Sequence, residues 1–583
     1  MAIPLRDYWR LLVVYLRPQR GRVGLLALSI FASIGLQLVL PQLLRRFIDD
    51  AMGGAATGAL SRIAVWFIVV ALLNQVCIAA AKYLGELIGW TATNELRADL
   101  TAHCLGLDQS FHKERSPGEM VERIDGDINL LATFFSQFAI DLLGNMVLIA
   151  GTLALLFRED LRIGLALTVF ALLGLALLLW IRGIAVPYQL AWREESARFF
   201  GFLGERLSGM EDIRAAGAVD YTQWRFTAHL RSWWPTARRS YLASVSAWVV
   251  TLTTFAIGNI VAFAIGLVLY RAGAITIGTV YLVFSYTELL RRPMERIRTQ
   301  LQDLQKAGAG IVRTQELFAR QTRLPDEGRV PLSAGALSAE FAGVTFRYDD
   351  DEPVLRSLDF RVAAGQTVAL LGRTGSGKTT IARLLARLYD PAAGVVRLGG
   401  VPVRDVALGD LRGRVGVVTQ DVQLFAGTVR ENLTFFDPVV PEDRLWATLD
   451  TLGLAGWVRG LPHGLDTELA PDGGGLSAGE AQLLAFARVF LRDPGLVILD
   501  EASSRLDPAT EALLDRAIAT VLHDRTGVII AHRLDTVRRA DLILILDAGE
   551  IVEFGERIAL ATDPASHYSR LLSADTAGEE VLA

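Results

Sequence analysis

Six long apolar stretches dominate the first half of the chain. They lie at about residues 23–44, 62–88, 135–157, 161–182, 243–270 and 274–293. A helix needs roughly 20 predominantly apolar residues to cross about 30 Å of hydrocarbon, and each stretch approaches or exceeds that length. The pattern therefore predicts six membrane-spanning helices, which return the chain to the side of the membrane on which it started.

The segments between these predicted spans alternate in length and charge. Long, helix-patterned, arginine-rich segments join spans two to three and four to five, whereas the other connections are short. Residues 1–20 are basic and amphipathic, which is typical of an interfacial elbow helix, and no cleavable signal peptide is expected. The positive-inside tendency places both termini and everything after the sixth span in the cytoplasm. We therefore expect a multi-pass protein of the cytoplasmic (inner) membrane, surrounded by membrane lipid.

From about residue 336 the pattern changes. Short apolar runs alternate with helical stretches and glycine-rich turns, as in a mostly parallel α/β sheet. This half also contains a phosphate-loop motif at residues 372–379. The predicted fold is therefore a membrane α-helical bundle of six transmembrane helices with long cytoplasmic extensions, fused to an α/β P-loop ATPase domain. The predicted boundaries are 1–20 for the elbow helix, 21–320 for the transmembrane domain with two coupling segments, 321–335 for a linker, 336–575 for the nucleotide-binding domain and 576–583 for a C-terminal tail.

A complete phosphate-loop motif, G-x-x-x-x-G-K-[ST], occupies residues 372–379, between an apolar strand-like run and a helix-like stretch. Glycines let backbone N–H groups converge on phosphates, and the start of the following helix adds positive potential. The lysine is expected to reach the β- and γ-phosphates and the threonine to ligate Mg²⁺. The predicted contacts to ATP or GTP are Gly372, Thr374, Gly375, Ser376, Gly377, Lys378, Thr379 and Thr380.

A second apolar run, residues 496–500, ends in two carboxylates, Asp500 and Glu501. Acids at the end of a buried strand are unfavourable unless they meet a metal or a water molecule. We expect Asp500 to hold Mg²⁺, and Glu501 to orient or activate the water that attacks the γ-phosphate.

The overall composition supports a membrane protein. The chain has 583 residues, 52% of them hydrophobic, and a mean hydropathy of +0.35. Its net charge of −5 gives no indication of a nucleic-acid partner. Cys77 and Cys104 are far apart and form neither a disulfide framework nor a metal-ligand pattern, so we interpret both as small apolar fillers.

Residues 476–480, Leu-Ser-Ala-Gly-Glu, precede a helical stretch and lie some twenty residues before the Asp500–Glu501 pair. Together with the motifs above, in this order, they make the chain resemble a half-size ABC exporter, with one six-helix transmembrane domain and one ATP-binding cassette. The resemblance implies further roles. Tyr348 stacks on adenine, Ser477 and Gly479 contact nucleotide, Gln420 senses the metal and the membrane domain, His532 contacts the γ-phosphate, and Asp507 falls in the D-loop.

The same resemblance implies that the chain acts in a pair, because each ATP site takes its phosphate loop from one cassette and its signature motif from another. Ala478 and Glu480 depart from the usual Leu-Ser-Gly-Gly-Gln signature, and Arg505 departs in the D-loop. Glu480 either brings negative charge toward the phosphates or complements the helix dipole. We favour a heterodimer with a second half-transporter over a homodimer. Coupling helices are expected near residues 108–113 and 216–221.

The function predicted from these features is ATP-driven export by alternating access, with ATP and Mg²⁺ as cofactors. The cargo is an amphiphilic small molecule such as a drug, a lipid or a peptide, and the sequence does not choose among them. The alternative is an ATP-gated channel or a regulatory membrane ATPase on the same scaffold. That alternative is disfavoured, because both Glu501 and His532 are present.

Overall fold

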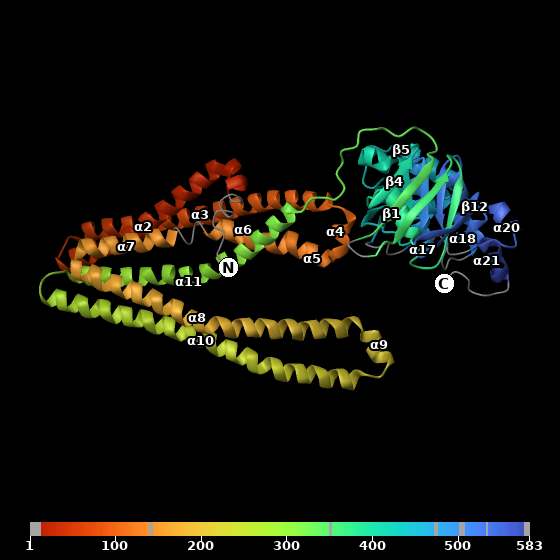
Figure 1. The fold of residues 1–583 in the computed structure, drawn as a ribbon. Coiled ribbons are helices and arrows are strands. Elements are labelled where there is room, and N and C mark those ends of the chain that lie inside the picture. Colours follow the sequence, from red (N-terminus) through yellow and green to blue (C-terminus); the bar gives the residue numbers. More distant parts are fainter. Residues whose placement is uncertain are drawn as a thin grey trace. The chain divides into compact units, whose positions relative to one another are not determined.

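A computed structural model describes residues 13–138, 144–348, 352–470, 476–500, 508–531 and 534–576 (Figure 1). The chain forms two compact units. The first comprises Met1–Leu105 and Ser116–Arg320, and the second comprises Gly106–Arg115 and Gln321–Ala583. The short segment Gly106–Arg115 therefore groups with the C-terminal unit, although it lies within the stretch of sequence assigned above to the transmembrane domain.

The first unit is made of helices, several of which are much longer than a membrane is thick. A 49-residue helix is about 74 Å long, so it extends well beyond about 30 Å of hydrocarbon. The main helices are α2 (Arg20–Met52), α3 (Thr57–Leu105), α6 (Asp127–Phe138), α7 (Gly144–Glu159), α8 (Leu161–Ser208), α10 (Val219–Arg271) and α11 (Ile277–Ala319). Shorter elements are η1 (Arg17–Gln19), α5 (Pro117–Val121), η2 (Glu122–Gly126) and α9 (Met210–Ala215).

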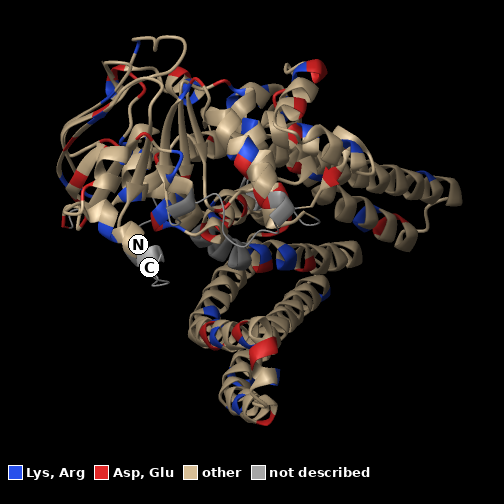
Figure 2. Cartoon of the chain, turned by 90° about the vertical axis from the view of Figure 1, so that its right-hand side faces the viewer, with Lys and Arg blue, Asp and Glu red and all other residues tan. Residues whose placement is uncertain are grey.

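Four segments of the described chain are long and apolar enough to cross a membrane, namely Val13–Met52, Thr57–Leu105, Leu161–Ser208 and Val219–Arg271. They contain predicted spans one, two, four and five. Figure 2 shows that long stretches of helix in the chain carry no Lys, Arg, Asp or Glu. The third predicted span runs through residues outside the described ranges. The sixth lies in α11, where charged residues such as Glu288 and Arg291 interrupt the apolar pattern.

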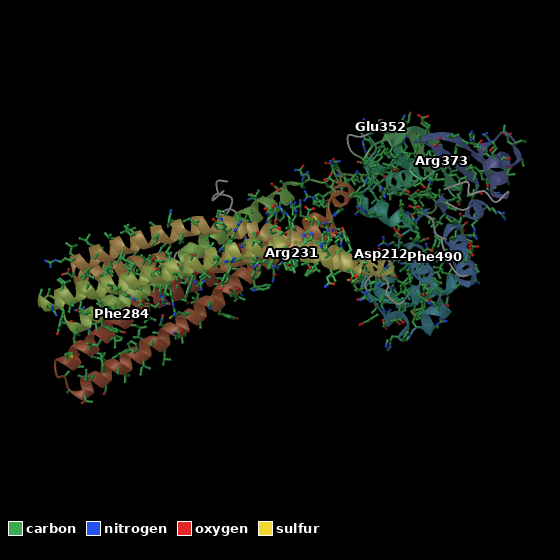
Figure 3. The ribbon with its side chains drawn as sticks, turned by 90° about the horizontal axis from the view of Figure 1, so that it is seen from below. Asp212, Arg231, Phe284, Glu352, Arg373 and Phe490 are labelled. Atoms are coloured by element: carbon green, nitrogen blue, oxygen red, sulfur yellow. The ribbon has the colours of Figure 1, made fainter. Side chains whose placement is uncertain are left out.

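Polar side chains inside the helical unit pair with one another. Ser33 on α2 donates to Asn74 on α3 at 3.1 Å, and Asn259 on α10 donates to Glu288 on α11 at 2.6 Å. Such pairs satisfy polar groups that cannot reach water. The ends of α8 and α10 that adjoin α9 carry many charged side chains. Figure 3 labels Phe284, which stacks on Phe263, and then Arg231 and Asp212 farther along the unit.

The second unit contains two main sheets. The first has the order β2-β1-β4-β5, formed by β1 (Ala339–Phe346), β2 (Leu355–Val362), β4 (Ala393–Leu398) and β5 (Val401–Pro402). The larger sheet has the order β12-β11-β3-β10-β9-β6, formed by β3 (Thr367–Leu371), β6 (Val415–Val418), β9 (Leu496–Asp500), β10 (Thr526–Ile530), β11 (Leu542–Asp547) and β12 (Glu550–Glu556). Its strands are parallel except β12. β7 (Gly427–Thr428) and β8 (Glu468–Leu469) form a small ribbon.

Helices cover the larger sheet, so its central strands are buried on both faces. In β3, Val368 and Leu370 belong to one hydrophobic cluster, and Ala369 and Leu371 belong to the other. The helices described in the second unit are α4 (Gln109–Glu114), α12 (Lys378–Leu385), α13 (Leu408–Arg414), α14 (Val429–Thr434), α15 (Glu442–Thr451), α16 (Ala455–Gly460), α17 (Ala478–Leu491), α18 (Pro508–Leu522), α19 (Leu534–Val537), α20 (Arg557–Thr562) and α21 (His567–Thr576), with η4 (Val403–Asp405) and η5 (Gly464–Asp466). The predicted fold class, a helical transmembrane domain fused to an α/β nucleotide-binding domain, is confirmed.

Candidate nucleotide site

The loop between β3 and α12 has a backbone that glycine favours. Gly372, Gly375 and Gly377 have φ values of 144°, 85° and 109°. A methyl group at Gly372 would lie 2.2 Å from the carbonyl oxygen of Leu546, so the position excludes any larger residue. The loop therefore folds as a tight turn that delivers its N–H groups to the start of a helix, as anion binding requires.

A buried ammonium group lies inside this loop. Lys378 is only 5% exposed, and its Nζ donates to the carbonyl oxygens of Gly372 at 2.5 Å and Arg373 at 3.0 Å. The hydroxyl of Ser376 is buried and has no hydrogen-bond partner among the described residues. A buried cation and an unsatisfied donor at a helix start suit a polyphosphate. Thr379 is exposed, so its hydroxyl is accessible to a metal ion, and Thr374 is also exposed.

Tyr348, just beyond β1, is tied to the helix that follows the phosphate loop. Its hydroxyl lies 2.9 Å from the Thr380 hydroxyl and accepts a hydrogen bond from Arg383 at 2.9 Å. The Lys113 ammonium lies 4.5 Å from the centre of its ring. The Arg383 guanidinium also lies over the ring, at 5.8 Å. The aromatic residue predicted to stack on adenine is thus linked to the helix after the phosphate loop, and two cations lie over its ring.

Strand order brings the phosphate loop and Asp500 to one edge of the sheet. In parallel register, Ile530 of β10 is level with Leu370 of β3 and with Asp500 of β9, while Val418 of β6 is level with Leu499. The phosphate loop and Asp500 therefore lie at the same carboxyl edge, where open α/β sheets bind ligands. Gln420 follows β6 directly at this edge and is exposed. Glu501, Asp507 and His532 lie outside the described residues.

The altered signature is a complete capping box. Ser477 is the N-cap of α17, and its hydroxyl accepts from the Glu480 N–H at 3.3 Å while its own N–H donates to Glu480 Oε2 at 2.7 Å. The other oxygen of Glu480 accepts from the Trp457 indole at 2.8 Å. Glu480 thus has a structural role at the helix start. Trp457 was not anticipated, because nothing in the sequence links it to the signature.

Both predicted coupling segments lie near short helices. In the first, α4 (Gln109–Glu114) overlaps the predicted residues 108–113. Asp108 caps α4 by accepting from the N–H groups of Ser110 and Phe111, at 3.1 and 3.3 Å, and it also accepts from the Arg323 N–H at 2.6 Å. Burial raises the pKa of Asp108, but these hydrogen bonds outweigh it and the net pKa is lowered. In the second, the short helix is α9, which ends at Ala215, directly before the predicted residues 216–221.

Two cavities in the second unit have different characters. One of about 420 Å³ is lined by residues that include Thr419, Gln423, Phe425 and Arg488, so its lining includes the chain neighbour of Gln420. Arg488 donates to Asn432 and Gln423, and burial lowers its pKa to about 10.

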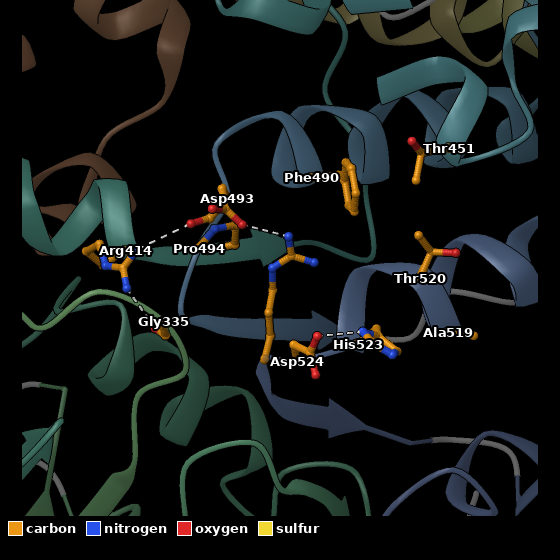
Figure 4. Close-up of a pocket in the computed structure, with 11 residues that line it drawn as sticks. Gly335, Arg414, Thr451, Phe490, Asp493, Pro494, Ala519, Thr520, His523 and Asp524 are labelled. Atoms are coloured by element: carbon orange, nitrogen blue, oxygen red, sulfur yellow. Dashed lines mark hydrogen bonds and ion pairs between the residues drawn. The ribbon is translucent and has the colours of Figure 1, made fainter. Parts of the chain in front are cut away.

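The other cavity, of about 650 Å³, is shown in Figure 4 and lies at the opposite, amino edge of the sheet. Its charged side chains pair within the chain: Arg525 bonds to Asp493 at 2.8 Å, and His523 contacts Asp524 at 3.0 Å. Although this cavity is larger, it lies away from the phosphate loop, so we do not regard it as the nucleotide site.

Comparison with known proteins gives consistent matches over nearly the whole chain. Residues 23–294 match the family described as "ABC transporter transmembrane region", and residues 355–504 match "ABC transporter". YknV of Bacillus subtilis (strain 168), an uncharacterized ABC transporter ATP-binding protein, is 31% identical over 563 residues, covering 94% of this chain and 91% of the relative.

Two further matches come from proteins whose roles are named. The ATP-dependent lipid A-core flippase of Photorhabdus laumondii is 29% identical over 558 residues, covering 92% of this chain and 93% of the flippase. A solved structure of a bacterial Atm1-family ABC exporter with ATP bound aligns with a TM-score of 0.78 and 25% identity. It covers 96% of this chain and 99% of that chain.

Proposed function

Because the chain belongs to the ABC transporter family, as a half-size exporter that couples ATP hydrolysis to transport across a membrane, we propose which of its residues bind and hydrolyse ATP. The phosphate-loop residues from Gly372 to Thr380 hold the triphosphate, with Lys378 on its terminal phosphates and Tyr348 on adenine. The observation that supports this assignment is the parallel register of β3, β10, β9 and β6, by which the phosphate loop and Asp500 lie at the same carboxyl edge of the large sheet.

Mg²⁺ fits the same edge. Thr379, Gln420 and Asp500 supply a hydroxyl, an amide and a carboxylate, which are the oxygen ligands that Mg²⁺ prefers. When bound, the ion neutralises charge on the phosphates. Glu501 orients and activates the attacking water, and His532 contacts the γ-phosphate. These two roles rest on the family resemblance, since both residues lie outside the described ranges.

Exporters of this family work as dimers, and we propose that this chain pairs with a different half-transporter. Support comes from its intact phosphate loop and Asp500–Glu501 pair beside a signature that departs from the family at Ala478 and Glu480. The phosphate loop of this chain would meet the partner's signature and form the ATP site that hydrolyses ATP. The altered signature of this chain would complete the second ATP site, at the partner's phosphate loop, which would be the weaker one. The cavity lined by Thr419 and Gln423 is a suitable seat for a coupling segment.

We place the protein in the cytoplasmic membrane with both termini and the ATPase domain in the cytoplasm. The proposed cargo is an amphiphile, with a lipid as the leading class, because one relative is a lipid A-core flippase. The apolar stretches of α8 and α10 suit lipophilic cargo but do not select a headgroup.

The test of pairing uses the chain without a partner. We expect the purified chain, expressed in a host that lacks related half-transporters, to bind ATP but hydrolyse it slowly, and Glu501→Gln to retain binding while turnover disappears. Fast turnover by the lone chain, equal to that of the complex purified from its native membrane, would refute the heterodimer. Turnover unaffected by Glu501→Gln would remove that residue from its assigned role.

A further inference from the structure

Lys113 joins two parts of the chain that are far apart in sequence. It lies in the first predicted coupling segment, between α3 and α5, and its ammonium is 4.5 Å from the centre of the Tyr348 ring. Both residues belong to the second compact unit. A cation at this distance over an aromatic face is attracted by the ring quadrupole. The contact therefore holds the coupling segment against the aromatic residue proposed to bind adenine.

The position of Lys113 is fixed by its neighbours. Asp108 caps the first turn of α4 and accepts the Arg323 N–H at 2.6 Å, so the segment is tied to the chain that leads into β1. Phe111 is 9% exposed, and the Arg115 guanidinium lies 5.2 Å from its ring. A short helix with a capped start and a buried aromatic residue presents Lys113 from a defined place.

The Tyr348 ring is equally constrained on its other sides. The buried rings of Phe346 and Tyr389 pack against it nearly perpendicularly, with centroids 4.8 and 5.2 Å away. Its hydroxyl is held by Thr380 and Arg383. The Arg383 guanidinium also lies over the ring, 5.8 Å from its centre. Because these contacts fix the ring, a base that stacks on the face under Lys113 has to displace the ammonium.

We propose that Lys113 competes with the nucleotide base for the face of Tyr348, so that ATP binding releases the segment around α4. This rests on the proposed role of Tyr348 and adds a regulatory contact to it. Release would pass directly to α3 and α5, the helices that flank the segment in the chain. Lys113 thus acts as a latch: the base stacks on Tyr348 only when the Lys113 ammonium has left the ring.

The first test measures affinity for a non-hydrolysable ATP analogue in the full-length protein in lipid nanodiscs. An exposed cation–π contact corresponds to a factor of roughly two to five in a binding constant. We expect Lys113→Gln to bind the analogue about two- to fivefold more tightly. Arg115→Gln, on the same segment but over Phe111, is the matched control and should bind as wild type does.

Two outcomes overturn the proposal. Unchanged or weaker binding by Lys113→Gln would show that the ammonium does not compete. Equal tightening by Arg115→Gln would show a general charge effect. Tyr348→Leu separates this inference from the proposed role of Tyr348. If Tyr348→Leu leaves the affinity for the analogue unchanged, Tyr348 does not bind the base and the latch fails as well. If Tyr348→Leu weakens binding and Lys113→Gln then has no further effect, both proposals stand, whereas a persisting effect of Lys113→Gln would refute the latch alone.

The second test is hydrogen exchange in wild-type protein. We expect the amides of residues 106–115 to exchange faster when the analogue is bound, because the segment has lost its contact with the ring. In Lys113→Gln the same amides should already exchange fast without analogue. Slower exchange on binding in the wild type would mean that ATP tightens this contact, which contradicts the latch.

Discussion

The structure makes a quantitative prediction about Glu480, the most conspicuous departure in the signature. Its two carboxylate oxygens face two donors, the Ser477 N–H at 2.7 Å and the Trp457 indole at 2.8 Å. A glutamine has one acceptor oxygen, so Glu480→Gln leaves one donor without an acceptor. Leaving a partly buried donor unsatisfied costs about 1 kcal/mol, the lower end of the usual range because Trp457 is half-buried. That corresponds to roughly fivefold more frequent opening of the first turn of α17.

The assay is hydrogen exchange on the full-length protein, followed in peptides that cover the start of α17. We expect Glu480→Gln to raise the exchange rate about fivefold when Trp457 is present and clearly less in a Trp457→Phe background. Glu442→Gln is the matched control. Glu442 also accepts an indole N–H, from Trp446 at 3.1 Å, but at the start of α15. An equal effect of Glu480→Gln in both backgrounds would refute the coupling between Glu480 and Trp457.

Three further substitutions follow from individual contacts. Gly372→Ala should weaken ATP binding about tenfold or more in a fluorescent-nucleotide titration, because its methyl would meet a carbonyl oxygen, and wild-type affinity would contradict the loop geometry. Asp127 is buried and binds Arg313 through both oxygens, so Asp127→Asn should reduce the free energy of unfolding by about 1–3 kcal/mol, seen as an earlier thermal transition. The folded-state pKa of Asp108 is lowered, so its stabilisation is present above the unfolded value near 4 and is lost as pH falls through the lowered pKa. The difference in melting temperature between wild type and Asp108→Asn should therefore be constant at neutral pH and shrink below about pH 4, and a difference that does not change with pH would refute it.

The phosphate loop and the fold class were predictable because their signals are local. The apolar run 367–371 is a buried strand, and the glycines after it take the positive φ values that such a turn needs. The long apolar stretches likewise predict helices, since an uncharged run of that length has few other stable forms in a membrane. In both cases contiguous residues determine the structure, so a single sequence suffices.

The second coupling segment shows the limit of local signals. The family resemblance placed a coupling helix near residues 216–221. In the structure the short helix α9 ends at Ala215, the chain turns at residues 216–218 with Gly217 at a φ of 65°, and α10 begins at Val219. A glycine in the left-handed region ends a helix, so this residue carried a usable signal for the boundary.

Two contacts beside the proposed nucleotide-binding residues are not local at all. Trp457 and Glu480 meet because α16 and α17 pack in one unit, and Lys113 meets Tyr348 although one precedes most of the membrane helices and the other follows them all. No periodicity marks either pair, because each residue taken alone suits its own helix or turn. Yet these pairs involve the two parts of the cassette proposed to contact nucleotide, the signature and the adenine-stacking tyrosine. Family motifs therefore indicate where ATP is expected to bind. In our proposal the coupling of that binding to the helices also depends on Lys113, a side chain outside those motifs. Lys113→Gln tests this coupling without altering any residue proposed to contact nucleotide.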